Sequence, residues 1–389
     1  MSSCQEGFVP PVNPFDKLSE LAELAAAHDG GAVDLSIGTP CDPPAPAVVE
    51  ALASSGTERG YPPSAGTPAL REAAAAWLQR RLGVSVPPSQ IAPCVGSKEF
   101  VAGVPHWLHL RKPSADTVLY PGLAYPTYEM GADLARCRAV AVAVNAEGRL
   151  DLASVAAEDA ERALCLWVNS PGNPAGQLED LAAAAEWGRA RGVPVLSDEC
   201  YVEFTWSDRG RTILEHGLSG VLAVHSLSKR SNLAGLRVGY FAGDPELVAY
   251  LAGVRQHAGF IVPGPVQHAA AVALADDAHV DAQRAVYLER LETLAQWLAD
   301  AGLPVSLPGG GFYLWVRAPA NVAGARAGES AGFALARWMA ARAGVIGSPG
   351  EAYGLAGADY LRLAVVQPME RLKLVATRLA ASGGASPWH

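Results

Sequence analysis

The sequence predicts an α/β protein, with a large domain built on a mostly parallel seven-stranded sheet and a smaller α/β C-terminal domain. Short apolar runs of strand character recur through the middle of the chain, and alanine-rich helical patterns separate many of them. Near-continuous apolar strands that alternate with helices are typical of a parallel sheet covered on both faces. After about Asp276 the pattern changes to a long helical segment, the run GGGFYLWVRA, another helix and the run YLRLAVV.

Seven apolar runs are predicted to be the strands of the large domain. In chain order they are IAPCV from Ile91, TVLYP from Thr117, AVAVAV from Ala139, LCLWV from Leu164, PVLSD from Pro194, VLAVHS from Val221 and RVGYFAG from Arg237. The segment TPALREAAAAWLQRRLG is predicted to be a helix, with Thr67 as its N-cap and Pro68 in its first turn. We expect residues 1–45 to form an N-terminal arm that joins the small domain, residues 46–275 to form the large domain, and residues 276–389 to form the small domain.

The composition argues against several classes of function. The formal net charge is -9 and no basic run occurs, so we expect no nucleic-acid partner. The cysteines are scattered without a CxxC pair, which favours free thiols in a reducing compartment over disulfides or a zinc site. The N-terminus has no signal-peptide pattern, and no apolar run reaches the roughly 18 residues that span a bilayer. We therefore expect a cytoplasmic protein with no metal and no membrane partner.

Polar residues collect where the predicted strands end. GSKE follows IAPCV, NSPGNP follows LCLWV, SDECY ends the run PVL, and SLSK follows VLAVH. In parallel sheets of this kind, ligands bind outside the carboxyl ends of the strands. The sequence therefore predicts a binding site at this edge of the sheet.

Lys229 in SLSK is the residue around which this site is expected to form. The hydroxyls of Ser226 and Ser228, with Arg237 eight residues beyond the lysine, are suited to hold a phosphate. Positive neighbours and partial burial favour the neutral, nucleophilic form of the Lys229 amine. Such an amine forms a Schiff base with an aldehyde, and an aldehyde that carries its own phosphate is pyridoxal 5'-phosphate. For a lysine taken alone, a solvated surface role is the alternative.

Pyridoxal 5'-phosphate makes further demands that the sequence meets. Its ring nitrogen needs a carboxylate, and Asp198 lies at the end of a buried strand, where capping of the next turn is the alternative. Asn173 and Tyr201 are placed to donate to the ring oxygen, and Tyr125 offers an aromatic face. The glycine turn before Ser97 and Lys98 provides amide donors at a predicted helix N-terminus for the phosphate.

Together, SLSKxxxLAGLRxG, NSPGNPAG and SDECY make the chain similar to the fold-type I, pyridoxal-phosphate-dependent aminotransferases of the aspartate aminotransferase superfamily, class I/II. The resemblance runs from VDLSIGTP to YLRLAVV, with Ala175 where the family usually has threonine. It implies that Lys229 is the Schiff-base lysine and the proton shuttle, that Asp198 pairs with the ring nitrogen, and that Tyr125 stacks on the ring. Tyr201 and Asn173 would bond the ring oxygen. The residues implied to hold the phosphate are Ser97, Lys98, Ser226, Ser228 and Arg237.

The resemblance also implies residues for the substrate and for a dimer. Arg362 in YLRLAVV resembles the arginine that clamps the substrate's α-carboxylate, with Gly38 and Asn173 completing that site. Without the resemblance to the family, we would expect this arginine to be an exposed residue of an alternating strand. Tyr61 resembles the tyrosine that reaches the partner subunit's phosphate in an obligate homodimer, and a packed loop tyrosine is the alternative.

Within the family, the motifs are similar to those of actinobacterial succinyldiaminopimelate transaminases. That enzyme type moves an amino group between glutamate and N-succinyl-2-amino-6-oxopimelate, whose extra carboxylates call for basic groups in the pocket. The candidates are Arg59, Lys98, Arg230 and Arg255, and an ordinary solvated role is the alternative for each of them. The same motifs leave open an aspartate, aromatic or secondary-metabolite aminotransferase, or a pyridoxal-phosphate-dependent lyase. A ligand sensor on this fold is the alternative of a different class.

Overall fold

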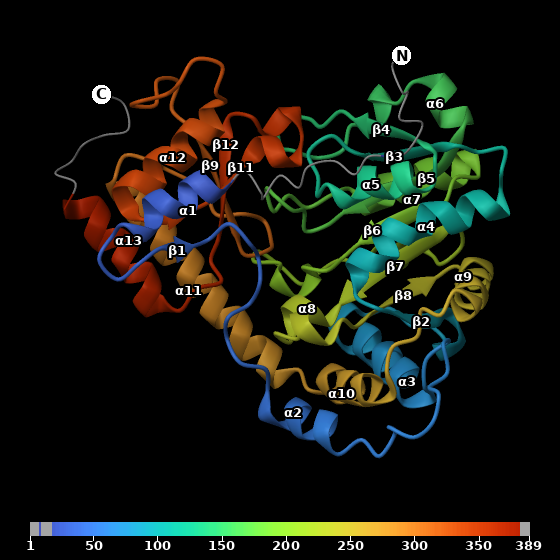
Figure 1. The fold of residues 1–389 in the computed structure, drawn as a ribbon. Helices are drawn as coiled ribbons and strands as arrows, with labels where there is room; N and C mark the ends of the chain where they lie inside the picture. The colour runs from blue at the N-terminus through green and yellow to red at the C-terminus, as the bar shows by residue number, and fades with distance from the viewer. Residues whose placement is uncertain (1–7, 9–17, 382–389) are drawn as a thin grey trace, which may run out of the picture.

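The computed structural model describes residue 8 and residues 18–381, and Figure 1 shows how its elements are arranged. The helices are α1 Ser19–Ala26, α2 Pro46–Ala53, α3 Pro68–Trp77, α4 Ser97–Arg111, α5 Thr127–Leu134, α6 Ala157–Glu161, α7 Leu181–Arg191, α8 Leu227–Arg230, α9 Pro245–His257, α10 Gly264–Ala275, α11 Ala278–Asp300, α12 Ala331–Ala343 and α13 Met369–Ala381. The strands are β1 Val33–Asp34, β2 Ile91–Cys94, β3 Thr117–Pro121, β4 Arg138–Val142, β5 Ala163–Asn169, β6 Val195–Asp198, β7 Val221–Ser226, β8 Gly239–Gly243, β9 Tyr313–Arg317, β10 Val345–Ile346, β11 Ser348–Pro349 and β12 Tyr360–Ala364.

The main sheet has seven strands in the order β2-β8-β7-β6-β5-β3-β4. Strand β8 runs antiparallel to both of its neighbours, β2 and β7, and the other strand pairs are parallel. The prediction of a mostly parallel seven-stranded sheet is confirmed, and each predicted run supplies one strand. The last strand begins at Gly239 rather than at Arg237, because Arg237 adopts a left-handed backbone with φ 53° that a strand does not accommodate.

Both faces of this sheet are covered, which explains the continuous apolar runs. All seven residues of β5 are buried, and alternate side chains point to opposite faces. Trp167 belongs to the apolar core that also contains residues of α4, α5 and α9, whereas Val168 belongs to the core shared with α3, α7 and α10. The helices therefore sandwich the sheet, as Figure 1 shows.

The helix cap predicted at Thr67 is confirmed. The Thr67 hydroxyl accepts a hydrogen bond from the Leu70 amide at 3.3 Å, and Pro68 is the first residue of α3. This cap satisfies one of the amides that the first helical turn leaves without an internal partner.

A third apolar core holds the C-terminal elements together with the start of the chain. It contains residues of α1, α11, α12, α13, β9 and β12. Strand β1 pairs in parallel with β10, and β11, β12 and β9 form an antiparallel three-stranded sheet. We propose on this basis the division at residues 45/46 and 275/276 into arm, large domain and small domain. Residues 1–7, 9–17 and 382–389 of these segments lie outside the described residues.

No helix in the described part of the chain has the length and apolar character needed to cross a membrane.

Candidate active site

The carboxyl-terminal edge of the sheet brings several of the predicted residues together. Lys229 lies in α8, directly after β7, and its Nζ donates to the carbonyl oxygen of Gly38. The Gly38 backbone is buried and leaves no room for a side chain, because an added Cβ would lie 2.2 Å from the Tyr313 hydroxyl. The segment that follows β1 therefore reaches into the site from the region where β1 packs with the C-terminal elements.

The Lys229 amine is poised to lose its proton. Burial lowers the pKa of Lys229 to about 8, and the nearby positive charges of Arg362 and Arg237 also lower it, while Cys200 acts in the opposite direction. A substantial fraction of the side chain is neutral slightly above neutral pH, and only the neutral amine is a nucleophile or a base.

Asp198 is a carboxylate at the end of β6 that has neutral hydrogen-bond partners. Its oxygens accept from the Tyr128 hydroxyl at 3.0 Å and from the Cys200 amide at 3.2 Å. Burial raises the pKa of Asp198, and these two hydrogen bonds oppose the rise. It forms no ion pair with any residue that the structure describes, so it remains available to a positively charged group of a ligand.

Arg362 on β12 is buried, and the side chain of Asn173 holds it. Its Nη1 donates to Asn173 Oδ1 at 2.7 Å, and its Nη2 donates to the Ser36 carbonyl. The guanidinium carbon lies 4.2 Å from the centre of the Tyr313 ring and 4.8 Å from that of Tyr353. Arg362 Nε is buried and has no hydrogen-bond partner among the described residues, so the arginine keeps a free donor.

The Tyr201 hydroxyl lies 2.6 Å from that of Tyr313 on β9. Burial raises the pKa of Tyr201, and the adjacent Tyr313 raises it further. Tyr201 therefore keeps its proton at neutral pH, so its hydroxyl is available as a hydrogen-bond donor. Tyr313 was missed at the sequence level although it stands in the quoted run GGGFYLWVRA, because no spacing links that run to the residues after β6.

A glycine turn, a helix N-terminus and an arginine meet beside β2, β7 and β8. Gly96 has φ 77° and precedes Ser97, the first residue of the 15-residue helix α4. A Cβ on Gly96 would lie 2.2 Å from Arg237 Nη2, so the guanidinium packs directly against this glycine. Ser226 Oγ accepts from the Ser228 amide at 3.2 Å, as the N-cap of α8. Free amides, hydroxyls and a cation thus converge, which suits an anion.

The remaining predicted residues lie around this edge with fewer contacts. Tyr125 is half-buried, and Lys98 Nζ lies 5.5 Å from the centre of its ring. Tyr61 is fully exposed, at 101% of its reference area, and Arg59 is also exposed. The packed-loop reading of Tyr61 is therefore wrong within this chain.

Two of the arginines suggested for a distal substrate carboxylate are engaged elsewhere. Arg255 is 1% exposed and makes paired hydrogen bonds of 2.6 and 2.8 Å to Glu99. Arg230 is also buried, and its Nε lies 3.4 Å from Glu203 Oε1. The suggestion is wrong for Arg230 and Arg255, because each cation is neutralised where it is buried.

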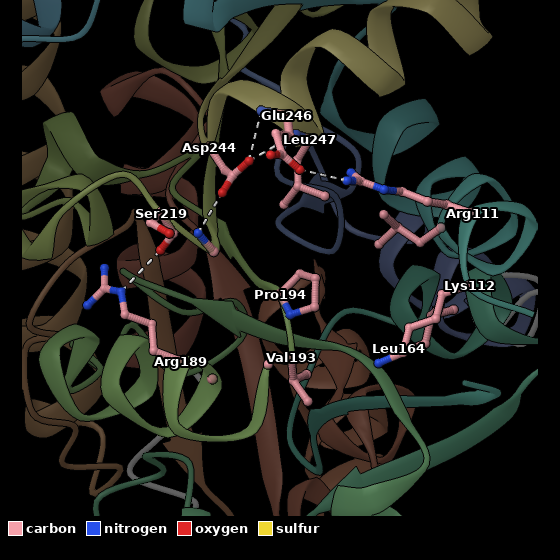
Figure 2. A pocket seen from close by; sticks show the side chains of 14 residues that line it. Arg111, Lys112, Leu164, Arg189, Val193, Pro194, Ser219, Asp244, Glu246 and Leu247 are labelled. Carbon is pink, nitrogen blue, oxygen red and sulfur yellow. Dashed lines mark hydrogen bonds and ion pairs between the residues drawn. The ribbon is translucent and has the colours of Figure 1, made fainter. Parts of the chain in front are cut away.

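A cavity of about 620 Å³ lies at the opposite edge of the sheet (Figure 2). Its polar groups already serve the fold: Asp244 accepts from the Gly220 amide at 2.8 Å and caps α9, and Arg111 pairs with Glu246 at 3.1 Å. Arg189 donates to the Ser219 carbonyl. This cavity faces the amino ends of the parallel strands, away from Lys229. We therefore do not assign the function to this cavity.

The chain matches the family described as aminotransferase class I and II over residues 31–379. The chain belongs to the class I and II aminotransferases. It is 42% identical over 377 residues to the 4-dedimethylamino-4-oxo-anhydrotetracycline transaminase of Streptomyces rimosus, covering 95% of this chain and 99% of the relative. It is also 42% identical over 378 residues to a protein of Mycobacterium tuberculosis named as a probable aminotransferase, covering 95% and 85%.

A solved structure named as a probable N-succinyldiaminopimelate aminotransferase, from Thermus thermophilus, superposes on this aminotransferase with a TM-score of 0.82. The two are 30% identical, and the match covers 95% of this chain and 100% of the other. The fold predicted from the sequence is thus that of the family.

Class I and II aminotransferases with this fold use pyridoxal phosphate, and the residues at this edge fit that group. The site formed by Gly96, Ser97 and Arg237 suits a phosphate. Because Gly96 has no Cβ, the guanidinium of Arg237 can pack directly against the turn at the start of α4. Asp198 has no cationic partner among the described residues, as a carboxylate reserved for a protonated ring nitrogen requires. Lys229 supplies an amine with a lowered pKa.

Proposed function

We propose that this aminotransferase moves the amino group of glutamate to N-succinyl-2-amino-6-oxopimelate, as a succinyldiaminopimelate transaminase in lysine and diaminopimelate biosynthesis. The observation that carries the proposal is an uncompensated cation next to the site. Lys98 makes no ion pair with a described residue, and its ammonium lies over the ring of Tyr125. A substrate with carboxylates far from its reacting carbon needs such a charge.

The proposed roles begin with the substrate's α-carboxylate. Pyridoxal phosphate, when bound, supplies the aldehyde carbon that accepts the amino group and a ring that withdraws electrons from the α-carbon. Arg362 binds the α-carboxylate through its planar guanidinium, and Asn173 and Gly38 complete this site. Holding the carboxylate in one orientation directs the α-hydrogen toward Lys229, whose neutral Nζ removes the proton and later returns it.

The other proposed roles concern the ring and the phosphate. Asp198 holds the proton of the ring nitrogen, Tyr201 and Asn173 donate to the ring oxygen, and Tyr125 covers one face of the ring. The phosphate is bound by the amides at the start of α4 and by polar side chains. Ser97 and Lys98 contribute mainly their backbone amides, and Ser226, Ser228 and Arg237 contribute their side chains.

We further propose that the enzyme is a cytoplasmic homodimer with shared active sites. Tyr61 supports this, because its ring is fully exposed in the single chain on a loop of the large domain. A large aromatic side chain with no packing partner in its own chain is typical of a residue that is buried by a partner.

A second candidate substrate class comes from the relatives. The Streptomyces rimosus transaminase, which is named for a tetracycline intermediate, is as similar to this chain as the Mycobacterium tuberculosis aminotransferase. An aminotransferase of secondary metabolism is therefore the alternative. Its keto substrate would be a polycyclic ketone without distal carboxylates, which gives the unpaired ammonium of Lys98 no carboxylate to bind.

An acceptor screen with glutamate as donor separates the two. We expect turnover of the succinylated keto acid, and we expect Lys98→Met to raise KM for that acid by roughly tenfold while leaving KM for pyruvate within about twofold. Efficient turnover of a polycyclic ketone together with no turnover of the succinylated acid would contradict the substrate assignment. Release of pyruvate and ammonia from an amino acid without an acceptor would instead indicate a lyase.

A further inference from the structure

Glu199 and His225 form a buried pair directly behind the candidate active site. Glu199 follows Asp198 at the end of β6, and His225 precedes Ser226 at the end of β7. The two residues are 1% and 3% exposed, and Glu199 Oε2 lies 3.5 Å from His225 Nε2. The Glu199 amide also donates to the Val224 carbonyl at 2.9 Å. The pair thus stands where the two strands that deliver the site residues are still hydrogen-bonded to each other.

Unsatisfied polar atoms converge at this pair. Glu199 Oε2, both ring nitrogens of His225, the Tyr240 hydroxyl and Arg230 Nη2 are buried and have no hydrogen-bond partner among the described residues. These four side chains line a cavity of about 10 Å³, which is near the size that a single water molecule occupies. Buried polar groups are stable only when they are hydrogen-bonded, so these atoms must share protons with one another, directly or through such a water.

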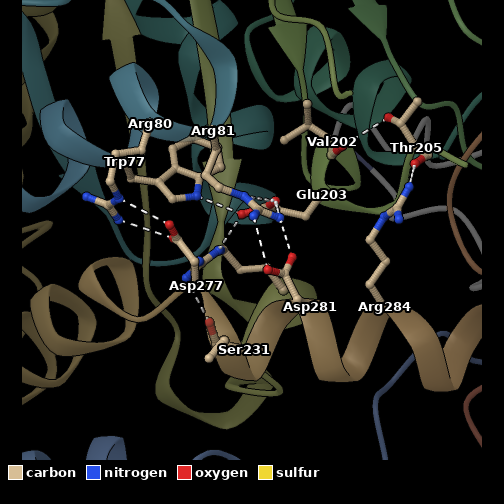
Figure 3. Close-up of polar contacts among 12 residues, drawn as sticks. Trp77, Arg80, Arg81, Val202, Glu203, Thr205, Ser231, Asp277, Asp281 and Arg284 are labelled. Atoms are coloured by element: carbon tan, nitrogen blue, oxygen red, sulfur yellow. Dashed lines mark hydrogen bonds and ion pairs between the residues drawn. The ribbon is translucent and has the colours of Figure 1, made fainter. Parts of the chain in front are cut away.

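Glu203, five residues after Asp198, shows what a buried ionised carboxylate looks like in this protein. It accepts from Trp77 Nε1 at 2.7 Å, and it lies 3.0 Å from Arg81 (Figure 3). Arg230 lies 3.4 Å from it. Two guanidinium groups therefore stabilise its charge. Glu199 has no arginine or lysine partner among the described residues.

The hydrogen bonds of Glu199 fit the protonated state. One of its oxygens accepts from the Ile213 amide at 2.8 Å, and the other faces His225. A buried carboxyl group with a neutral donor on one oxygen and an imidazole beside the other is most stable as the acid, because ionisation would leave an uncompensated charge.

We propose that Glu199 and His225 are positioning residues for the transamination, with Glu199 held as a neutral acid that shares its proton with His225. The proton remains between the carboxyl group and the imidazole, so the pair stays neutral overall. The contact sets the relative position of the strand ends that carry Asp198 and Ser226. Because Glu199 is neutral, it adds no second negative charge beside Asp198, whose own charge is needed for the ring nitrogen.

The electrostatics of the surrounding elements agree with this arrangement. Burial raises the pKa of Glu199 to about 8; the negative charge of Asp198 acts in the same direction, and hydrogen bonds from the Ile213 amide, Thr212 and Ser197 act against it. Burial, together with the positive charge of Arg230, lowers the pKa of His225 to about 3. The titratable or charged groups that face the pair come from β6 and the turn after it, the 3-10 helix Val202–Phe204, α8 and β8. They are Asp198, Cys200, Glu203, Arg230 and Tyr240.

Infrared difference spectroscopy of the holoenzyme tests the proposal. At neutral pH we expect the carbonyl stretch of a protonated carboxylic acid, which disappears in Glu199→Gln and persists in the matched control Glu203→Gln. The band should fade as the pH rises through about 8. Identical spectra for the wild type and Glu199→Gln in this region would overturn the proposal. The measurement needs no substrate, so its failure is distinct from a failure of the proposed function.

Kinetics and cofactor absorption test the positioning role. Glu199→Ala and His225→Phe should each lower kcat on the order of tenfold with little change in KM for the amino donor, because a buried partner is left unsatisfied. Both variants should shift the pH at which the visible absorption of the bound cofactor changes. Glu199→Gln, which keeps the shape and a donor, should recover most of the loss in kcat. Unchanged kcat and absorption in both truncated variants would contradict the role.

Discussion

Lys229 illustrates how burial, with a contribution from nearby positive charges, prepares a side chain for chemistry. The pKa of its amine is about 8 in the folded chain against an ordinary value of 10.5, and the first cause is burial. Below pH 8 the amine is charged in the folded and unfolded chain alike, and the full penalty of burying that charge is present. Between the two pKa values the unfolded chain holds a proton that the folded chain has lost, so the stability of the fold rises with pH.

Replacing the amine by a thioether should therefore stabilise the cofactor-free protein at neutral pH. We expect Lys229→Met to raise the free energy of unfolding by on the order of 2 kcal/mol near pH 7. This is less than the free energy that corresponds to the whole pKa shift of Lys229, because the side chain keeps partial solvent access. The advantage should shrink above pH 8 and vanish near pH 10.5. Urea unfolding of both proteins across this range measures it, and a pH-independent difference would contradict the argument.

Arg362 presents a planar donor group that lysine does not reproduce. Asn173 and the Ser36 carbonyl orient its guanidinium, and Nε remains free. We expect Arg362→Lys to lower kcat/KM for amino acids by roughly 10- to 100-fold, mainly through KM, because one of two parallel hydrogen bonds to the carboxylate is lost. Tyr353→Phe, which keeps the ring beside the guanidinium, is the control and should change kcat/KM by less than about threefold.

At the scale of the element, the start of α4 depends on a single glycine. Gly96 combines a left-handed backbone with direct contact to Arg237. We expect Gly96→Ala to lower the affinity for pyridoxal phosphate at least tenfold, because the methyl group displaces the guanidinium from the phosphate site. Gly259→Ala separates strain from crowding, since Gly259 has φ 79° and nothing within 4 Å of an added Cβ. It should cost about 1 kcal/mol of stability and leave cofactor titration unchanged.

The strands and the residues after them were predictable because their pattern is local. An apolar run followed by polar residues can be read from the sequence, as with β6 and Asp198 or β7 and Lys229. Partners contributed by distant elements could not be read in this way. Tyr313 and Tyr128 each contact a predicted residue, but neither has a sequence signal that links it to that residue.

Long-range pairing also explains where the substrate arginines were misjudged. Glu99 stands in the quoted motif GSKE, 156 residues before Arg255 in the chain. Only the fold shows that their charges neutralise each other. An isolated cation in a sequence gives no indication of whether the fold will supply its counter-charge.

At the scale of the whole molecule, the site is assembled from three distant parts of the chain. Gly38 comes from the N-terminal segment, Lys229 follows the central sheet, and Arg362 comes from the C-terminal sheet. Arg81 links the elements around the central sheet to helix α11, because it pairs with Glu203 and with Asp281 on α11 (Figure 3). We propose on this basis that the substrate binds between the central sheet and the C-terminal sheet, whose relative position sets the distance from Arg362 to Lys229.

A subunit-mixing experiment tests whether the molecule also shares its sites between two chains. Lys229→Ala removes the reactive amine, and Tyr61→Ala removes the exposed ring that we propose reaches the partner's phosphate. In a mixed dimer, the Tyr61→Ala subunit keeps Lys229 and receives an intact Tyr61 from its partner, so one site in that dimer is complete. Random mixing makes half of the dimers mixed, and about a quarter of all sites should then be fully active. Co-expression of differently tagged variants measures this. Activity equal to the mean of the two separate variants would mean that each chain completes its own site.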